Sequence, residues 1–257
     1  MRGCNFDLSG RTVLVTGASS GIGHRFASAL ATSGAQVVLG ARRVERLEEL
    51  RATIEGEGGR ALTVAMDVCD EASVIAAFDA AEHTFGSVDS VVANAGIGYP
   101  SPALELSIAD FDRMIATNLR GMFLTAREGA RRMIAKGAPA RGHGRIVMIS
   151  SITAYHVTAS MSAYSASKAA VTQLGRVLAK EWASDGVNVN VIAPGYMVTE
   201  LTEGLWSHES GQQLLASFPR KRIMSVDALC PLALYLCSDA SLAVTGSVFS
   251  VEDGQTL

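Results

Sequence analysis

The sequence predicts a doubly wound α/β fold, in which one parallel sheet of about seven strands carries helices on both faces. Short apolar, β-branched runs alternate along the chain with helical patterns of ten or more residues. The runs are apolar throughout, which is typical of parallel strands that are buried on both faces. Right-handed crossovers then give the doubly wound arrangement. A length of 257 residues suits a single domain of this class.

The apolar runs are the expected strands, and the longer stretches with an apolar residue every three or four positions are the expected helices. The expected strands are residues 12–16, 36–40, 61–66, 88–93, 145–150, 187–193 and 247–251. The expected helices are residues 21–33, 44–57, 71–85, 108–135, 163–184 and 226–238. One long irregular segment, 194–222, remains, and such segments often form lids or binding loops. We therefore expect one domain over residues 1–257 with a substrate loop at 196–222.

Composition excludes several classes of function. The net charge of −3 and a pI near 6.0 leave no general basic field, so no nucleic-acid partner is expected. The longest apolar stretch, 228–237, contains Pro231 and is shorter than the ~18 residues that span a bilayer. The first residues lack the apolar core of a secretory signal. A cytoplasmic protein without a membrane partner is expected.

The cysteines and histidines are not spaced as metal ligands, so no metal is expected. The cysteines are Cys4, Cys69, Cys230 and Cys237, and they form no Cys-x-x-Cys pair. Cys230 and Cys237 are too far apart along an expected helix to form a disulfide. We expect reduced, mostly buried thiols.

A glycine-rich turn connects the first expected strand to the first expected helix. It reads Thr16-Gly17-Ala18-Ser19-Ser20-Gly21-Ile22-Gly23. Its glycines let the backbone approach a pyrophosphate, and the helix that follows offers free N–H groups and the positive end of its dipole. The same glycines could serve only a tight turn. Their position in the first strand–helix unit favours dinucleotide binding, as in Rossmann folds.

The end of the second expected strand favours NADP(H) over NAD(H). Rossmann proteins that bind NAD(H) usually carry an acid there for the ribose 2′-hydroxyl. This chain has Arg42 and Arg43 instead, and guanidinium groups suit a 2′-phosphate. Alternatively, both arginines are solvated at a helix start and pair with Glu45 or Glu48. That interpretation explains the charges but not the missing acid, so NADP(H) is favoured and NAD(H) stays possible.

Tyr164 and Lys168 are four residues apart, which places them on one face of an expected helix. A phenol has a reference pKa of ~10, and a nearby ammonium lowers this pKa by stabilising the phenolate. The pair can then act as general acid and base. The spacing alone also fits an interfacial tyrosine beside a surface lysine. Other motifs of the chain are therefore needed to choose between these two interpretations.

Six motifs that occur in order along the chain supply this context. They are Thr16-Gly-x-x-x-Gly-x-Gly23, Asn94-Ala95-Gly96, Asn118, Ser151, Tyr164-x-x-x-Lys168 and Pro194-Gly195. In this combination the chain resembles the short-chain dehydrogenase/reductase family over essentially its whole length. The separation of 13 residues between Ser151 and Tyr164 matches the usual spacing of the family and selects Ser151 over Ser150.

The resemblance implies an NAD(P)-dependent enzyme that acts on CH–OH groups, with the cofactor supplying the hydride. It implies that Tyr164 exchanges the proton, that Ser151 binds the substrate oxygen, and that Lys168 lowers the Tyr164 pKa and holds the nicotinamide ribose. Asn118 would order a water that links Lys168 to solvent. The implied cofactor-binding residues are Gly17, Ser19, Ser20, Gly21, Ile22, Gly23, Arg42, Arg43, Asp67, Val68, Asn94, Ala95, Gly96, Tyr164, Lys168, Pro194, Gly195, Val198 and Thr199.

A few positions depart from the pattern of the family. Ala93 precedes Asn94 where a second asparagine is common, and Gln255 replaces the last glycine of a common Asp-Gly-Gly. Neither change is expected to matter much. Ser20 stands where NADP(H)-preferring members often carry a basic residue, which weakens the NADP(H) prediction without reversing it, because Arg42 remains.

The favoured function is an NADP(H)-dependent oxidoreductase of a small, mostly neutral or apolar ketone or secondary alcohol. A 3-oxoacyl carrier-protein reductase is a narrower alternative. Asp185 argues against it, because an acid near the site would repel an acidic carrier protein, although Arg141 could compensate. A catalytically silent dinucleotide sensor or scaffold is a third possibility, and the complete set of catalytic residues argues against it.

Two segments are expected to form the substrate pocket, namely the residues after Ser151 and the loop 196–222. The expected substrate-binding residues are Ser151, Thr153, His156, Tyr164, Tyr196 and Trp206. The apolar side chains of the loop favour a mobile lid, with a surface excursion packed on a neighbouring helix as the plainer alternative.

The expected helices 108–135 and 163–184 carry apolar residues on more than one face, which indicates a partner helix besides the sheet. The resemblance implies that these helices pair across a dimer axis and that the C-terminal strand forms a second contact. A homotetramer with two-fold axes follows.

Overall fold

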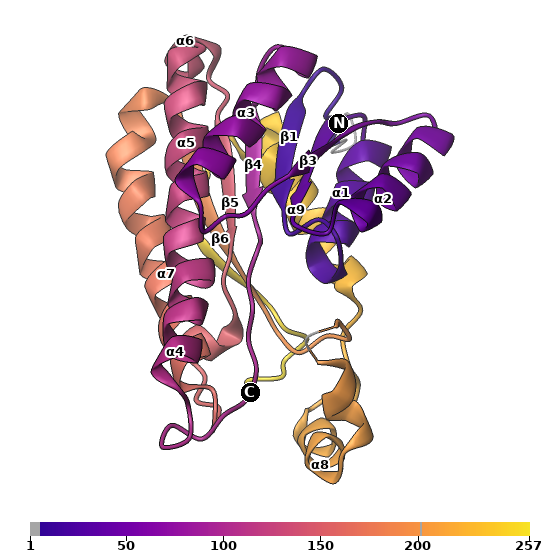
Figure 1. The fold of residues 1–257 in the computed structure, drawn as a ribbon, viewed down its shortest axis with the longest axis vertical. Helices are drawn as coiled ribbons and strands as arrows, with labels where there is room; N and C mark the ends of the chain where they lie inside the picture. Colours follow the sequence, from indigo (N-terminus) through magenta and orange to yellow (C-terminus); the bar gives the residue numbers. More distant parts are fainter. Residues whose placement is uncertain (1–5, 201) are drawn as a thin grey trace.

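The structure is a computed structural model that describes residues 6–200 and 202–257 (Figure 1). Seven strands form one sheet in the order β3-β2-β1-β4-β5-β6-β7, and every neighbouring pair is parallel. The strands are β1 (Thr12–Thr16), β2 (Gln36–Ala41), β3 (Arg60–Ala65), β4 (Ser90–Ala93), β5 (Arg145–Ile149), β6 (Asn188–Pro194) and β7 (Val248–Val251). The predicted fold class is confirmed.

Helices cover both faces of the sheet, and each face has its own apolar core. The helices of one face are α1 (Gly21–Thr32), α2 (Val44–Gly56) and α9 (Cys230–Cys237). The helices of the other face are α3 (Glu71–Phe85), α5 (Met122–Ala135) and α7 (Ser162–Trp182). Val13 and Val15 of β1 point into the first core and Leu14 into the second. This alternation explains why the strands are apolar throughout.

The predicted helix 108–135 is two α-helices joined by a π-helical segment. α4 (Ile108–Ile115) and α5 flank this segment, Ala116–Gly121. A Cβ on Gly121 would lie 2.7 Å from Cγ2 of Val68, so the glycine permits a close approach of the two backbones. The apolar pattern continues through both helices, so the sequence does not indicate the π-helical segment between them. Such π-helical bulges are frequent at functional sites, and Asn118 lies in this one.

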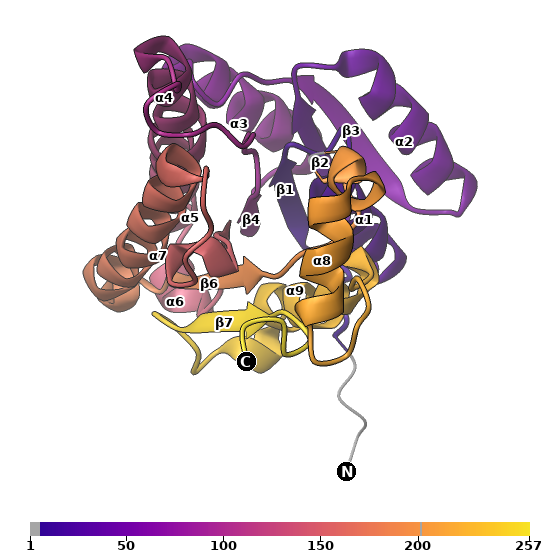
Figure 2. The same ribbon diagram turned by 90° about the horizontal axis from the view of Figure 1, so that it is seen from below.

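The predicted irregular segment 194–222 is partly helical. It contains a 3-10 turn, Glu203–Ser207, and α8 (Glu209–Ser217). A further short helix, α6 (Ala138–Arg141), precedes β5, and a 3-10 segment, Val226–Leu229, leads into α9. Figure 2 shows α8 on one side of the carboxyl ends of the central strands, with α4 and α7 on the other.

Residues 6–200 and 202–257 contain no helix that is both long and apolar enough to cross a membrane. In the same part of the chain, no group of three or more His, Cys, Asp or Glu residues is arranged to hold a metal ion. Cys69, Cys230 and Cys237 are free thiols. Cys4 lies outside the described residues.

The order of the strands reverses next to β1. β2 and β3 lie on one side of it, and β4 to β7 lie on the other. The chain therefore leaves the carboxyl ends of β1 and β4 in opposite directions, which opens the crevice where doubly wound folds bind their ligands. Most of the predicted site residues lie at or after the carboxyl ends of strands of this sheet.

Candidate active site

Ser151 lies at the carboxyl end of β5, and its side-chain oxygen accepts hydrogen bonds within the protein. Its Oγ accepts hydrogen bonds from the backbone N and the Oγ1 of Thr153, at 3.2 and 3.1 Å. The hydroxyl proton of Ser151 is therefore free to be donated. The Ser150 hydroxyl instead donates to the carbonyl oxygen of Lys168 at 2.8 Å and lies 2.7 Å from Oγ1 of Thr172. This geometry favours Ser151 over Ser150 as the residue that binds a substrate oxygen.

Lys168 is buried one helical turn after Tyr164 on α7. Its Nζ donates to the carbonyl oxygen of Ile149 at 2.9 Å and lies 5.6 Å from the centroid of the Tyr164 ring. Burial lowers the pKa of Lys168 to about 8. Its ammonium group can therefore exchange protons closer to neutral pH than an exposed lysine can.

The pKa of Tyr164 does not move in the expected direction. Burial raises this pKa to about 12, whereas the neighbouring Ser151 hydroxyl lowers it. Lys168, whose Nζ donates to the carbonyl oxygen of Ile149, is not among the groups that shift the pKa of Tyr164. Tyr164 is therefore a neutral phenol in this structure, which suits the donation of a proton to a substrate oxygen.

Asn118 is fully buried and holds the segment that follows β4. Its Oδ1 accepts a hydrogen bond from the N of Ile97, and its Nδ2 donates to the Ile97 oxygen, both at 2.8 Å. A Cβ on Gly96 would lie 3.3 Å from Oδ1 of Asn118 and 3.4 Å from Nζ of Lys168, so both side chains meet at this glycine. The contacts position the site, and the water relay through Asn118 stays a prediction.

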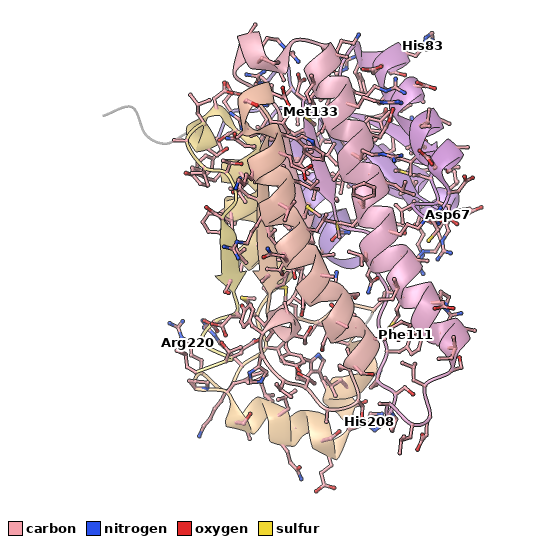
Figure 3. The ribbon with its side chains drawn as sticks, turned by 90° about the vertical axis from the view of Figure 1, so that its left-hand side faces the viewer. Asp67, His83, Phe111, Met133, His208 and Arg220 are labelled. Atoms are coloured by element: carbon pink, nitrogen blue, oxygen red, sulfur yellow. The ribbon has the colours of Figure 1, made fainter. Side chains whose placement is uncertain are left out.

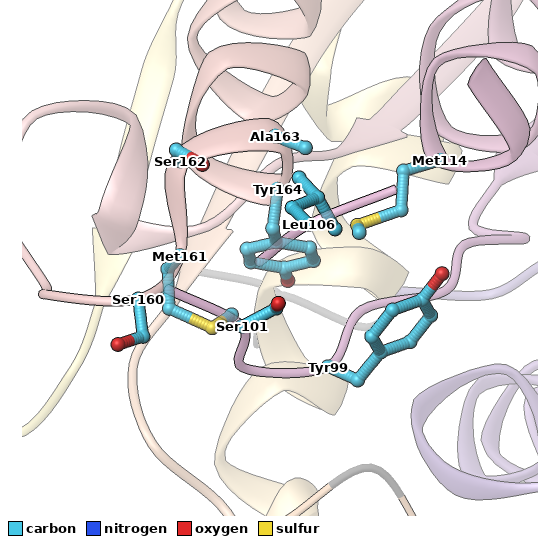
Figure 4. A pocket seen from close by; sticks show the side chains of 9 residues that line it. All are labelled: Tyr99, Ser101, Leu106, Met114, Ser160, Met161, Ser162, Ala163 and Tyr164. Carbon is cyan, nitrogen blue, oxygen red and sulfur yellow. The ribbon is translucent and has the colours of Figure 1, made fainter. Parts of the chain in front are cut away.

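A small space lies beside the ring of Tyr164, which is in the middle of the lining side chains in Figure 4. Its lining residues are Tyr99, Ser101, Leu106, Met114, Ser160, Met161, Ser162, Ala163 and Tyr164. Gly98 makes room for the ring, because a Cβ there would lie 2.5 Å from Cδ2 and 2.8 Å from Cε2 of Tyr164. No sequence motif singles out Gly98 or Tyr99, so neither is predicted as a site residue.

The glycine-rich turn has the form of a pyrophosphate site. Gly17 has a φ of 68°, in the left-handed region, and a Cβ on Gly23 would overlap the carbonyl group of Gly17. Ser20 is the N-cap residue of α1, but its side chain does not cap the helix. The first N–H groups of α1 are thus left without a side-chain cap. These features fit the pyrophosphate of a dinucleotide.

Thr16 joins this turn to the Asn94-Ala95-Gly96 motif. Its Oγ1 accepts hydrogen bonds from the backbone N of Asn94 and of Ala95, both at 3.0 Å. Nδ2 of Asn94 donates to the carbonyl oxygen of Thr16 at 2.9 Å. These bonds hold together the two strand ends that border the crevice.

Arg43, and not Arg42, reaches over the glycine-rich turn. Its Nη2 donates to Oγ of Ser19 at 3.1 Å and to Oγ of Ser20 at 2.6 Å. The Arg42 side chain is exposed, and it forms no hydrogen bond or ion pair with the part of the chain that the structure describes. Contact of either arginine with a 2′-phosphate stays a prediction.

The alternative pairing of these arginines with Glu45 or Glu48 is wrong. Arg43 pairs with Glu200 at 3.1 Å, and Glu48 pairs with Arg51 at 2.6 Å. Arg46, one turn further along α2, also pairs with Glu200. The sequence carries no signal for this cluster, because Glu200 is more than 150 residues away from the arginines along the chain.

Asp67 and Val68 follow β3, where the resemblance places the adenine. Oδ1 of Asp67 accepts a hydrogen bond from the N of Cys69 at 2.9 Å, so the carboxylate shapes its own loop. Val68 is buried against Gly121. Contact of either residue with adenine stays a prediction.

Among the residues that follow β6, some contact neighbouring segments and others are exposed to solvent. The N of Gly195 donates to the carbonyl oxygen of Val251 at 3.0 Å, which fixes the end of the strand that Pro194 closes. The Thr199 methyl group lies 3.7 Å from the position of a Cβ on Gly21, directly over the start of α1. Val198 is 55% exposed, and its contact with the nicotinamide end of the cofactor stays a prediction.

The predicted substrate residues converge only in part. The Tyr196 ring packs on Trp206 and Phe218, with centroids 6.0 and 5.7 Å apart, and the nearby Tyr196 hydroxyl also raises the Tyr164 pKa. Nε1 of Trp206 is buried and has no hydrogen-bond partner among the described residues. His156 is exposed, and its ring forms no hydrogen bond there either. Contact of His156 with a substrate stays a prediction.

Asp185 does not disfavour a carrier-protein substrate, contrary to expectation. The turn Ala183–Asp185 precedes β6 and therefore lies at the amino ends of the parallel strands. Arg141 pairs with Asp89 just before β4, at the same end of the sheet. The candidate site lies at the carboxyl ends, so neither residue bears on the choice of substrate.

Comparisons with known proteins agree with this geometry. A family model described as short chain dehydrogenase matches residues 11–210. D-threitol dehydrogenase of Mycolicibacterium smegmatis is 38% identical over 98% of this chain and 95% of that protein. Gluconate 5-dehydrogenase of Gluconobacter oxydans is 38% identical over 98% and 97% of the two chains. A gluconate 5-dehydrogenase from Burkholderia cenocepacia, solved in complex with NADP and tartrate, superposes with a TM-score of 0.91 at 36% identity, covering 98% of this chain and 97% of that chain.

Proposed function

The chain belongs to the short-chain dehydrogenase/reductase family and is an oxidoreductase of CH–OH groups, and we propose that it interconverts a small, uncharged secondary alcohol and its ketone with NADP(H) as the preferred cofactor. The observation that carries the proposal is the arrangement of Ser151, Tyr164 and Lys168 at the carboxyl end of β5. A silent sensor would not need a free serine proton beside a neutral phenol and a lysine with a lowered pKa.

Ser151 and Tyr164 would bind the substrate oxygen together. The Ser151 hydroxyl donates one hydrogen bond, because its own oxygen already accepts from Thr153. Tyr164 donates the second hydrogen bond and passes its proton to the oxygen during reduction. Lys168, which lies against the ring, carries a proton that can replace the one that Tyr164 gives up. In the oxidation direction the same protons move the opposite way.

The nicotinamide of the bound cofactor supplies or accepts the hydride. The residues that would hold the cofactor are those of the glycine-rich turn, the Asn94-Ala95-Gly96 motif, Thr199 and Arg43. The uncapped start of α1 suits the pyrophosphate. Arg43 above Ser19 and Ser20 suits a 2′-phosphate, and NADP in a related structure supports this preference.

A short polyol or a hydroxylated ring is the first candidate for the substrate. The side chains that surround the small space beside Tyr164 are serine, tyrosine and apolar side chains, and none of them is charged. This absence of charge among the lining residues supports a neutral substrate at Tyr164. The names of relatives that act on threitol and galactitol support the same class.

A panel of alcohols and ketones, followed by the absorbance of the reduced nicotinamide, tests this proposal. Neutral polyols and cyclic alcohols should be oxidised faster with NADP⁺ than with NAD⁺. Turnover of carrier-protein-bound or phosphorylated substrates at much higher kcat/KM than any neutral alcohol would contradict the substrate class, and tighter binding of NADH than of NADPH would contradict the cofactor preference.

A further inference from the structure

Glu200 places a carboxylate on the donors that suit a 2′-phosphate. Its Oε2 lies 3.1 Å from both Nη1 and Nη2 of Arg43, and its Oε1 pairs with Arg46. The same Arg43 guanidinium donates to Ser19 and Ser20 of the glycine-rich turn. A carboxylate and a phosphate oxygen bind the same guanidinium fork. Glu200 therefore takes up donors that an incoming phosphate would need.

Glu200 also belongs to the segment that leads into the proposed substrate loop. It follows Thr199, which lies over Gly21 at the start of α1. Met197, three residues before Glu200, forms an isolated β-bridge with Met224. This bridge joins the residues at the two ends of the loop. Within the described residues, the ion pairs of Glu200 thus connect the start of this loop to α2 across the cofactor crevice.

We propose that Glu200 is an intramolecular competitor of the cofactor 2′-phosphate, so that NADP(H) binding releases it from Arg43 and Arg46 and frees the start of the substrate loop. The inference rests on the proposed NADP(H) preference. A 2′-phosphate can bind Arg43 and Arg46 only when the Glu200 carboxylate leaves them. Part of the binding energy of the phosphate is therefore used to break the ion pairs of Glu200. A cofactor without this phosphate leaves the Glu200 contacts closed.

Calorimetric titration with two fragments that carry no nicotinamide tests the competition without any catalytic turnover. The fragments are adenosine 2′,5′-bisphosphate and adenosine 5′-monophosphate. Removing the charge in Glu200→Gln should tighten the bisphosphate by about two- to fivefold, the size of an exposed ion pair. The affinity for the monophosphate should not change.

Glu49→Gln is the matched control. Glu49 lies on α2 and lines the same depression as Ser19, Ser20, Arg46 and Glu200, but it forms no ion pair with a described residue. It loses the same charge at nearly the same place. An equal gain in bisphosphate affinity in Glu49→Gln would overturn the proposal. The gain would then come from the loss of any negative charge in this region, and not from the ion pairs of Glu200.

Hydrogen exchange of the backbone in residues 196–208 tests the second half of the proposal. In the wild type, the bisphosphate should speed exchange in this segment and the monophosphate should not. In Glu200→Gln, exchange should already be fast without any nucleotide. Equal exchange of the unliganded wild type and Glu200→Gln would overturn the release of the loop.

The outcomes separate this inference from the cofactor preference on which it rests. If the wild type prefers the bisphosphate and Glu200→Gln leaves that preference unchanged, only the competition fails. If neither protein binds the bisphosphate more tightly than the monophosphate, the NADP(H) preference fails together with it. If Glu200→Gln weakens the monophosphate instead, Glu200 accepts a ribose hydroxyl and the competition is wrong.

Discussion

The side-chain amide of Gln255 closes two hydrogen bonds on the backbone of Tyr196. Its Oε1 accepts from the N of Tyr196 at 2.6 Å, and its Nε2 donates to the Tyr196 oxygen at 3.1 Å. Asp253, two residues earlier, pairs with Arg220 and Arg222 at the other end of the proposed substrate loop. The C-terminal segment thus holds both ends of that loop. The replacement of glycine by Gln255, which the sequence suggests is of little consequence, has a structural role.

Gln255→Gly should loosen the loop. Two backbone groups of Tyr196 would lose their partners, which costs about 1–3 kcal/mol of unfolding free energy. Because Tyr196 packs on Trp206 and Phe218, KM for the substrate should rise more than kcat falls. Thermal unfolding and steady-state kinetics measure both effects. Gln213→Ala, which removes an exposed glutamine on α8 that bonds to Glu209, is the control and should change neither. An unchanged KM in Gln255→Gly would show that the loop does not need this contact.

Tyr164→Phe should lower kcat by about 10²- to 10⁴-fold, because it removes the proton and keeps the ring. Affinity for the cofactor should change little. Tyr235→Phe is the control, since Tyr235 lies on α9 and its ring packs on Phe6. Turnover of Tyr164→Phe above about a tenth of the wild-type value is incompatible with Tyr164 as the general acid and base.

Gly98→Ala should displace the ring of Tyr164 while the fold is kept. The added methyl would lie 2.5 Å from Cδ2 of Tyr164, closer than carbon atoms can approach, so the ring or the loop must shift. A displacement of about 1 Å at a reacting group can cost about 10²-fold in rate. Gly56→Ala, where nothing lies within 4 Å of the new methyl, is the control. Kinetics beside circular dichroism separate lost positioning from lost folding, and wild-type kcat in Gly98→Ala would contradict this role.

The sequence could predict those parts of the site that depend on local geometry. Helical spacing places Tyr164 and Lys168 together, and the parallel sheet brings Ser151 to the edge where the glycine-rich turn begins. The contacts of Gly98 with Tyr164, Glu200 with Arg43 and Gln255 with Tyr196 join segments that are far apart in the chain. They depend on the path of loops and on rotamers, and no local periodicity encodes them.

The same limit applies to the pKa of Tyr164. Spacing on a helix predicts that an ammonium is near a phenol, but not that both groups are desolvated. Nor does it predict that the ammonium donates to the Ile149 carbonyl. Burial depends on the packing of the whole domain, and here it outweighs the pairwise attraction that the spacing suggests.

The chain should form a homotetramer through α5 and α7, which lie side by side on one face of the molecule (Figure 3). Val177 of α7 is 42% exposed, whereas Val171 and Leu178 of the same helix are buried. Val177→Asp should weaken the assembly, since it would bury a charge in the interface. Light scattering should give a multiple of the chain mass for the wild type and a smaller one for the variant. A wild-type mass near 26.9 kDa at micromolar concentration contradicts the assembly.

His143 should make the protein less stable as the pH falls from about 6.5 towards 4. The ring is fully buried between the amino ends of the strands, where Nδ1 lies 2.6 Å from Oδ1 of Asp239. Burial, and then the charge of Arg145, lowers its pKa from 6.5 to about 4. In this pH range the unfolded chain binds a proton that the native protein does not bind. The free energy of unfolding therefore decreases as the pH decreases. The loss should reach about 3 kcal/mol below pH 4.

Unfolding by denaturant between pH 7 and pH 4.5 measures this effect in the wild type and in His143→Gln. The substitution keeps a polar side chain beside Asp239 but removes the titrating ring, so the fall of stability with pH should become shallower. His208→Gln, which changes an exposed histidine next to α8, is the control and should keep the wild-type slope. Asp239 does not confuse the comparison, because its pKa is lowered from 3.8 and its contribution is lost only at more acidic pH. Parallel slopes for the wild type and His143→Gln would show that His143 takes up its proton in the native state as readily as in the unfolded chain.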